Sequence, residues 1–135
     1  MRNIFKQFSK IELLLFITIL IIYINNLFID IMKIDAAQYA SIALEMLTNN
    51  SYLQVTEMQA DYLDKPPLLF WISSTNMGLF GVCNFAYKIG TFLMLLLSLL
   101  AIYKLSLRYY NQEIAKNATL IFASCQAFFQ MTNDV

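Results

Sequence analysis

The stretch from Ile89 to Leu107, IGTFLMLLLSLLAIYKLSL, decides the fold class of this chain. The hydrocarbon core of a bilayer requires about 20 mostly apolar residues per helix, and this stretch meets that requirement with Lys104 near its end. Stretches of the same character lie at about 11–29 and about 114–131. We therefore predict three membrane-spanning helices, with an outer loop of about 30–88 between the first and the second.

Composition supports an all-α integral membrane protein. The chain is 59% hydrophobic and 13% charged, whereas charged residues make up about a quarter of ordinary soluble domains. The formal net charge is zero and no long basic run is present, so the sequence offers no electrostatic footprint for nucleic acid. We treat residues 1–135 as one domain or part of one.

The basic residues predict the orientation in the membrane, because cytoplasmic flanks carry an excess of lysine and arginine. They cluster before the first predicted span and around the connection between the second and third, at Arg2, Lys6, Lys10, Lys104, Arg108 and Lys116. The N-terminus is therefore expected in the cytoplasm. The outer loop would face the periplasm or the cell exterior of a bacterial inner membrane, or a lumen in a eukaryote.

Most of the acidic residues lie in the outer loop. They are Asp30, Asp35, Glu45, Glu57, Asp61 and Asp64, and residues 30–65 carry only two lysines, Lys33 and Lys65. Carboxylates fixed at a membrane surface suggest chemistry on a molecule held in the membrane.

Two short interfacial helices are predicted within the outer loop. In the first, Asp35 takes the N-cap position, Gln38 completes a capping box, and Asn49 and Asn50 end the helix. Its apolar residues share one face suited to lying along the membrane: Tyr39, Ile42, Ala43 and Met46.

The remainder of the loop is predicted in two parts. Residues 52–63 have no clear period and are interpreted as an irregular loop. Pro66 and Pro67 then start the second helix, which ends near Gly81 and lies in the plane of the outer leaflet. Its polar run from Ser73 to Asn76 is interpreted as a solvated face, or as the lining of a sugar pocket.

The order of these features resembles a known family. An apolar span is followed by IDAAQYASIALEML, by a loop of roughly fifteen residues, by YLDKPPLLFWI, and by GLFGVCNFAYKIG before the next span. This order resembles the N-terminal part of GT-C superfamily glycosyltransferases, in particular the lipid A aminoarabinose transferases and the protein O-mannosyltransferases. The resemblance covers about residues 11–135.

The resemblance implies roles for two residues. Asp35 would be the general base, removing a proton from the acceptor hydroxyl while the sugar leaves its polyprenyl-phosphate carrier with inversion. Lys65 would bind the carrier phosphate, whose negative charge grows as it leaves. The alternatives are a helix cap for Asp35 and an interfacial lysine whose stem lies along the apolar surface for Lys65.

Other residues are expected to have less specific roles. Asp64 and Tyr39 are expected to bind substrate beside Lys65, although Asp64 could instead pair with Lys65 or cap the following helix. The chain has no histidine, so we assign no metal ligand. A divalent metal held in part by Asp64 would need partners from beyond Val135. The family's second carboxylate falls near Asp134, and Ala36 replaces the glutamate that commonly follows the catalytic aspartate.

The sequence therefore predicts a membrane glycosyltransferase that acts on the outer face. It would move a sugar from a polyprenyl-phosphate donor to a hydroxyl or phosphate of a glycan, lipid or protein. We expect the chain to be a fragment of a longer protein and inactive alone. The alternative is a non-catalytic membrane subunit or a lipid-handling scaffold.

Overall fold

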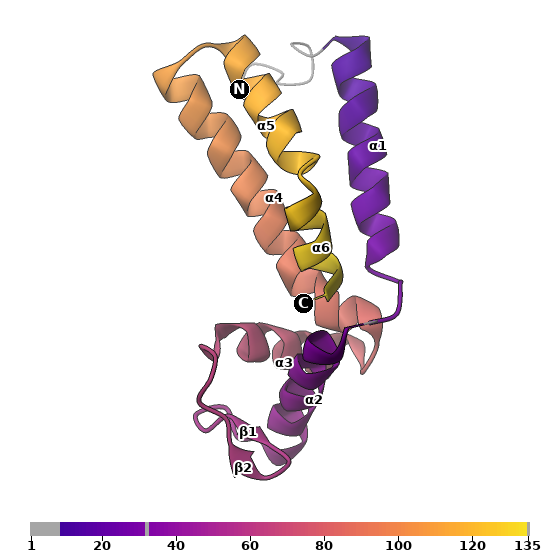
Figure 1. The fold of residues 1–135 in the computed structure, drawn as a ribbon, viewed down its shortest axis with the longest axis vertical. Helices are drawn as coiled ribbons and strands as arrows, with labels where there is room; N and C mark the ends of the chain where they lie inside the picture. The colour runs from indigo at the N-terminus through magenta and orange to yellow at the C-terminus, as the bar shows by residue number, and fades with distance from the viewer. Residues whose placement is uncertain (1–8, 32, 135) are drawn as a thin grey trace.

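A computed structural model describes residues 9–31 and 33–134, with only the backbone described at 133 and 134. The helices α1 (Lys10–Asn26), α4 (Asn84–Tyr109), α5 (Gln112–Ala123) and α6 (Gln126–Asp134) lie lengthwise together and form the helix bundle (Figure 1). The other elements gather at one end of it (Figure 1). They are α2 (Ile34–Asn49), β1 (Thr56–Glu57), β2 (Ala60–Asp61) and α3 (Leu68–Phe80), and they form the loop module.

The helix α4 provides the length of the bundle. Within the part of the chain that the structure describes, it is the one helix that is long and apolar enough to cross a membrane, with 26 residues. The helix α1 has 17 residues and covers most of the predicted first span. Much of its surface is exposed and apolar, at Ile11, Leu14, Leu15, Ile17, Leu20, Ile21, Ile22 and Ile24. A continuous apolar surface of this kind is suited to contact with lipid or with further helices.

The third predicted span is not one continuous helix. It is divided into α5 and α6 by Ser124 and Cys125. The Tyr23 hydroxyl of α1 donates a hydrogen bond of 3.1 Å to the carbonyl of Ala123. This carbonyl is at the C-terminal end of α5, where the last carbonyls have no partner within their own helix. The prediction of an unbroken helix over 114–131 is therefore wrong, while the membrane span itself stays a prediction.

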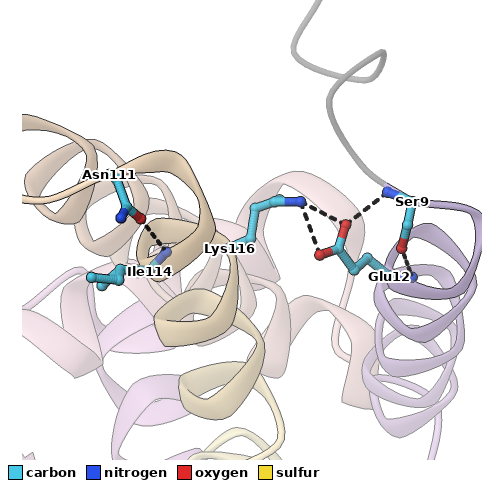
Figure 2. A network of polar contacts seen from close by, with 5 residues as sticks. All are labelled: Ser9, Glu12, Asn111, Ile114 and Lys116. Atoms are coloured by element: carbon cyan, nitrogen blue, oxygen red, sulfur yellow. Dashed lines mark hydrogen bonds and ion pairs between the residues drawn. The ribbon is translucent and has the colours of Figure 1, made fainter.

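At the end of the bundle away from the loop module, an ion pair joins α1 and α5. Lys116 Nζ lies 2.8 and 2.9 Å from the two carboxylate oxygens of Glu12, as Figure 2 shows. Glu12 also completes a capping box with Ser9 at the start of α1. Asn111 caps α5 by accepting a hydrogen bond from the Ile114 backbone N–H. Two helix starts and one ion pair thus fix the bundle at this end.

The loop module docks on the bundle where α3 crosses α4. Gly90 of α4 is buried, and a Cβ at this position would overlap the Ile72 side chain. Ser73 and Ser74 of α3 are also buried, and the Ser73 hydroxyl donates to the carbonyl of Tyr87 in α4. The prediction that the polar run of α3 is a solvated face is wrong for these two serines, because their small side chains allow close helix packing.

The outward face of α3 is apolar. Leu68, Leu79 and Phe80 are exposed. Trp71 is partly exposed, and its indole N–H donates to the carbonyl of Tyr52. The helix therefore buries both apolar and small polar side chains, Phe70, Ser73, Ser74 and Met77, and still leaves large apolar side chains on its exposed face.

The helix α2 packs inside the loop module. Ile42, Ala43 and Met46 are buried, against α3 and residues of the following segment. The prediction that this apolar face lies along the membrane is therefore wrong, because protein covers it. The helix ends as predicted: Asn50 adopts the left-handed conformation, with φ 53°.

Residues 52–63 contain a β-ribbon, which corrects the prediction of an irregular loop. Thr56 pairs with Asp61 and Glu57 with Ala60. The turn places Met58 and Gln59 at φ 50° and 66°, a conformation that non-glycine residues rarely adopt. No glycine or asparagine marks this turn in the sequence, so the usual hairpin signal is missing.

Glu45 of α2 holds this turn from outside the ribbon. Its carboxylate accepts hydrogen bonds from Thr56 Oγ1 at 2.7 Å and from the backbone N–H groups of Met58 at 2.9 Å and Gln59 at 3.1 Å. The hydrogen bond from Thr56, followed by those from the two N–H groups, holds the pKa of Glu45 below its usual value. A lowered pKa means that the ionised carboxylate is the form that stabilises the turn.

The ribbon should therefore loosen in acid. Its stabilisation by Glu45 is present at neutral pH and is lost as the pH falls through the lowered pKa. We expect the Met58 and Gln59 amide resonances, followed by NMR in detergent, to titrate together with a midpoint below the usual glutamate value of 4.5. Glu45→Gln should abolish this transition, and Glu57→Gln should leave it. A midpoint above 4.5 would contradict the assignment.

Candidate functional site

Asp35 lies in the first turn of α2 with an exposed side chain. The helix begins at Ile34 with Lys33 in the N-cap position and no side-chain cap. Gln38 donates instead to both carboxylate oxygens of Glu57, each at 2.8 Å. The predicted cap at Asp35 and its capping box with Gln38 are therefore wrong. Among the described residues, no hydrogen bond or ion pair occupies the Asp35 carboxylate, so it is available to a ligand.

Two tyrosines are fixed beside this carboxylate by one buried ring. Phe70 of α3 is almost fully buried and makes edge-to-face contacts with Tyr39 of α2 and Tyr62, at ring distances of 5.9 and 5.8 Å. Tyr39 follows Asp35 by four residues on the same helix. The aromatic contacts thus bring together two parts of the chain that each carry a predicted site residue.

Tyr62 is a site residue that the sequence analysis did not identify. Burial raises the pKa of its hydroxyl, and the nearby Tyr39, Asp64, Glu57 and Asp35 raise it further, in that order. Asp35 and Asp64, which the sequence separates by almost thirty residues, are therefore both within electrostatic range of the Tyr62 hydroxyl. The available signal was the position of Tyr62 within DYLDK.

Lys65 follows Asp64 in the exposed segment that leads into α3. Within the described residues, no direct contact joins Lys65 to Asp35, so their meeting over one phosphate stays a prediction. The helix α3 has Pro67 in its N-cap position and no side-chain cap. The alternative role of Asp64 as the cap of this helix is therefore wrong, because its carboxylate makes no such bond.

Asp35 lines a hollow between the loop module and the bundle. This hollow has a volume of about 330 Å³ and is lined from both sides. The loop-module side consists of Lys33, Asp35, Ala36 and Tyr39, and the bundle side consists of Ala127, Gln130 and Met131 of α6. The break before α6 thus brings a polar side chain, Gln130, to the hollow that holds the predicted base.

A somewhat larger hollow, of about 390 Å³, lies near the far end of α4. Leu105, Ser106, Tyr109 and Tyr110 line it. It contains no carboxylate or cation that could drive group transfer. The hollow at Asp35 is therefore the better candidate for chemistry.

Two predicted features stay open in this structure. Within residues 9–31 and 33–134, no three side chains among aspartate, glutamate and cysteine gather as a metal site. Asp64 as a metal ligand would therefore need partners from outside the described residues. Asp134 ends α6, but its side chain lies outside the described part, so its role as a second carboxylate stays a prediction.

Comparison with known proteins identifies the family of this chain. The model of the family described as dolichyl-phosphate-mannose-protein mannosyltransferase matches residues 64–135, which include Lys65, α3 and the helices α4 to α6. The chain belongs to this family of helical membrane proteins, as its resemblance to GT-C glycosyltransferases predicts. No solved structure matches the chain.

The curated relatives are bacterial sugar transferases. The undecaprenyl phosphate-alpha-4-amino-4-deoxy-L-arabinose arabinosyl transferase of Erwinia tasmaniensis is 35% identical over 92 residues, or 67% of this chain and 17% of that protein. A Proteus mirabilis protein, arabinosyl transferase 1 of the same description, is 32% identical over 114 residues, or 83% of this chain and 21% of its own length. The chain thus spans about a fifth or less of these relatives.

Phe70 should be the main support of the tyrosine pair. Replacing it with alanine removes a buried ring and both edge contacts, which should cost about 3–5 kcal/mol. Chemical denaturation in detergent micelles, followed by tyrosine fluorescence, would measure this loss. Leu63→Ala, at an exposed neighbouring site, should change the free energy of unfolding by less than about 0.5 kcal/mol. Equal losses in the two variants would contradict the role of Phe70.

Proposed function

We propose that the chain is the N-terminal portion of a membrane glycosyltransferase that uses a polyprenyl-phosphate sugar donor. The family match and the arabinosyl transferase relatives support the reaction class. The observation that carries the proposal is the Asp35 carboxylate, which is exposed and unoccupied at a hollow shared by the loop module and the bundle. By itself, the isolated chain is expected to be inactive, because it supplies only part of a substrate pocket.

In the proposed reaction, Asp35 acts as the general base. It accepts the proton of an acceptor hydroxyl, and the oxygen of that hydroxyl forms a bond to the anomeric carbon. The bond from this carbon to the carrier phosphate breaks on the opposite face, so the configuration is inverted and the phosphate leaves with the electron pair. A carboxylate in this role must be ionised and within hydrogen-bond reach of the hydroxyl, which the absence of a competing cap at Asp35 favours.

Lys65 binds the carrier phosphate in this proposal, with Asp64 and Tyr39 as further substrate contacts. An ammonium group beside the leaving phosphate stabilises the charge that develops on it. The support is positional: Asp64 lies close enough to Tyr62 to raise its pKa, as Asp35 does, and Lys65 is the next residue along the chain.

The names of the relatives suggest the donor. They transfer an aminoarabinose unit and carry undecaprenyl phosphate in their description, so we propose a bacterial polyprenyl-phosphate sugar as the donor class. The acceptor is a hydroxyl or phosphate of a glycan, lipid or protein on the outer face.

The same proposal sets the orientation in a bacterial inner membrane. The N-terminus faces the cytoplasm, and the loop module faces the periplasm or the exterior. In this orientation α3 lies in the outer interface, which its exposed Leu68, Leu79 and Phe80 support. A donor with its lipid chain in the outer leaflet would then reach Asp35 from the membrane side.

Replacing Asp35 with asparagine should test the base directly. The amide keeps the size of the side chain but does not accept the proton, so kcat of the full-length protein should fall about 10²- to 10⁴-fold. Transfer from a radiolabelled polyprenyl-phosphate sugar in proteoliposomes would measure it. Asp61→Asn is the matched control, because Asp61 is exposed and makes its contact with Gln54 in the ribbon. Unchanged transfer by Asp35→Asn would favour the non-catalytic subunit instead.

Lys65→Met should test whether Lys65 binds the phosphate of the donor. Loss of one charge-assisted hydrogen bond costs about 1.5–3 kcal/mol, so the KM for the donor should rise roughly ten- to hundredfold. Donor titrations in the same proteoliposomes would give this value, with Lys104→Met as a control at the far end of α4. A donor KM that stays within twofold of the unsubstituted protein would remove Lys65 from the phosphate site.

A further inference from the structure

Three polar side chains follow one face of the first turns of α4. Asn84, Tyr87 and Lys88 are spaced i, i+3 and i+4, so they project from the same side of the helix. Each of them contacts the segment that leads from the end of α1 to the start of α2. None of the three belongs to the site described above.

Lys88 contacts the end of α1. Its side chain is fully buried, and Nζ donates to the carbonyl oxygens of Ile29 at 2.8 Å and Asn26 at 3.3 Å. Carbonyls at a helix C-terminus lack partners within the helix and carry the negative end of its dipole. A buried ammonium at this position therefore binds the end of α1 in a defined direction, which a packed apolar side chain would not do.

Asn84 and Tyr87 bind the segment from the end of α1 to the start of α2 at positions closer to Asp35. Asn84 Nδ2 donates to Asp30 Oδ1 at 2.7 Å. The Tyr87 hydroxyl donates to the carbonyl of Ala36 at 3.2 Å, and both residues are almost fully buried. Ala36 is the residue after Asp35, so this last bond fixes the backbone that carries the proposed base.

We propose that Asn84, Tyr87 and Lys88 form a clamp that positions Asp35 relative to the helix bundle. They are positioning residues, because none of them lines the hollow that would hold the reacting atoms. The clamp makes α4 the common reference for the end of α1 and for the first turn of α2. It rests on the proposed function, since its effect on rate is an effect on the orientation of Asp35.

Tyr87→Phe is the decisive variant, because it removes one hydroxyl and keeps the ring that fills the core. In the full-length protein in proteoliposomes, kcat should fall on the order of tenfold with the donor KM within twofold, since misplacing a catalytic group by about 1 Å can cost 10²-fold. Hydrogen exchange at residues 34–40 should become faster. Lys88→Met should give a larger loss of kcat, and Tyr109→Phe, an exposed tyrosine at the far end of the same helix, should change neither quantity.

The outcomes separate this inference from the proposed function. Unchanged exchange at residues 34–40 in Tyr87→Phe would overturn the clamp, and so would faster exchange with an unchanged kcat per folded molecule. If Lys88→Met does not fold, Tyr87→Phe alone decides. Absence of transfer in the unsubstituted protein, or full transfer by Asp35→Asn, would instead overturn the proposed function.

Discussion

The close approach of α3 to α4 is the constraint on which the rest of the structure depends. Gly90 leaves no room for a side chain beneath Ile72, and the buried Ser73 donates a hydrogen bond to the carbonyl of Tyr87 in the same pair of helices. Because of this contact, the loop module packs directly against the start of α4. It is not attached to the bundle through its connecting segments alone. The hollow at Asp35, which residues of the loop module and of the bundle line together, depends on that placement.

The sequence predicts the parts of this fold that have a strong local signal. The apolar run of α4, the end of α2 at Asn50 and the start of α3 after Pro67 are all present. The ribbon was missed because the turn at Met58 and Gln59 has no glycine, and its stability comes from Glu45, eleven or more residues earlier. The break after α5 was missed because Tyr23, which binds the freed carbonyl, is a hundred residues away.

In the candidate site, too, the residues with a local sequence signal could be predicted, and those brought in by tertiary packing could not. Asp35, Asp64 and Lys65 could be named from the family resemblance, and the family match covers residues 64–135, which include Asp64 and Lys65. Their surroundings could not be predicted, because Tyr62, Gln130 and the α4 residues reach Asp35 only through tertiary packing. The prediction of a helix cap at Asp35 was wrong for a related reason. The spacing of Asp35 and Gln38 fits a capping box, but Gln38 forms a long-range hydrogen bond with Glu57 instead.

The division of the predicted third span into α5 and α6 has a consequence for membrane insertion. With 12 and 9 residues, neither α5 nor α6 alone reaches the roughly 20 residues that a bilayer span requires. Backbone groups freed inside lipid must also find partners within protein, and Tyr23 supplies one of them from α1. If this stretch crosses the membrane, α5 and α6 must therefore insert together. They would insert beside α1, which is synthesised before them.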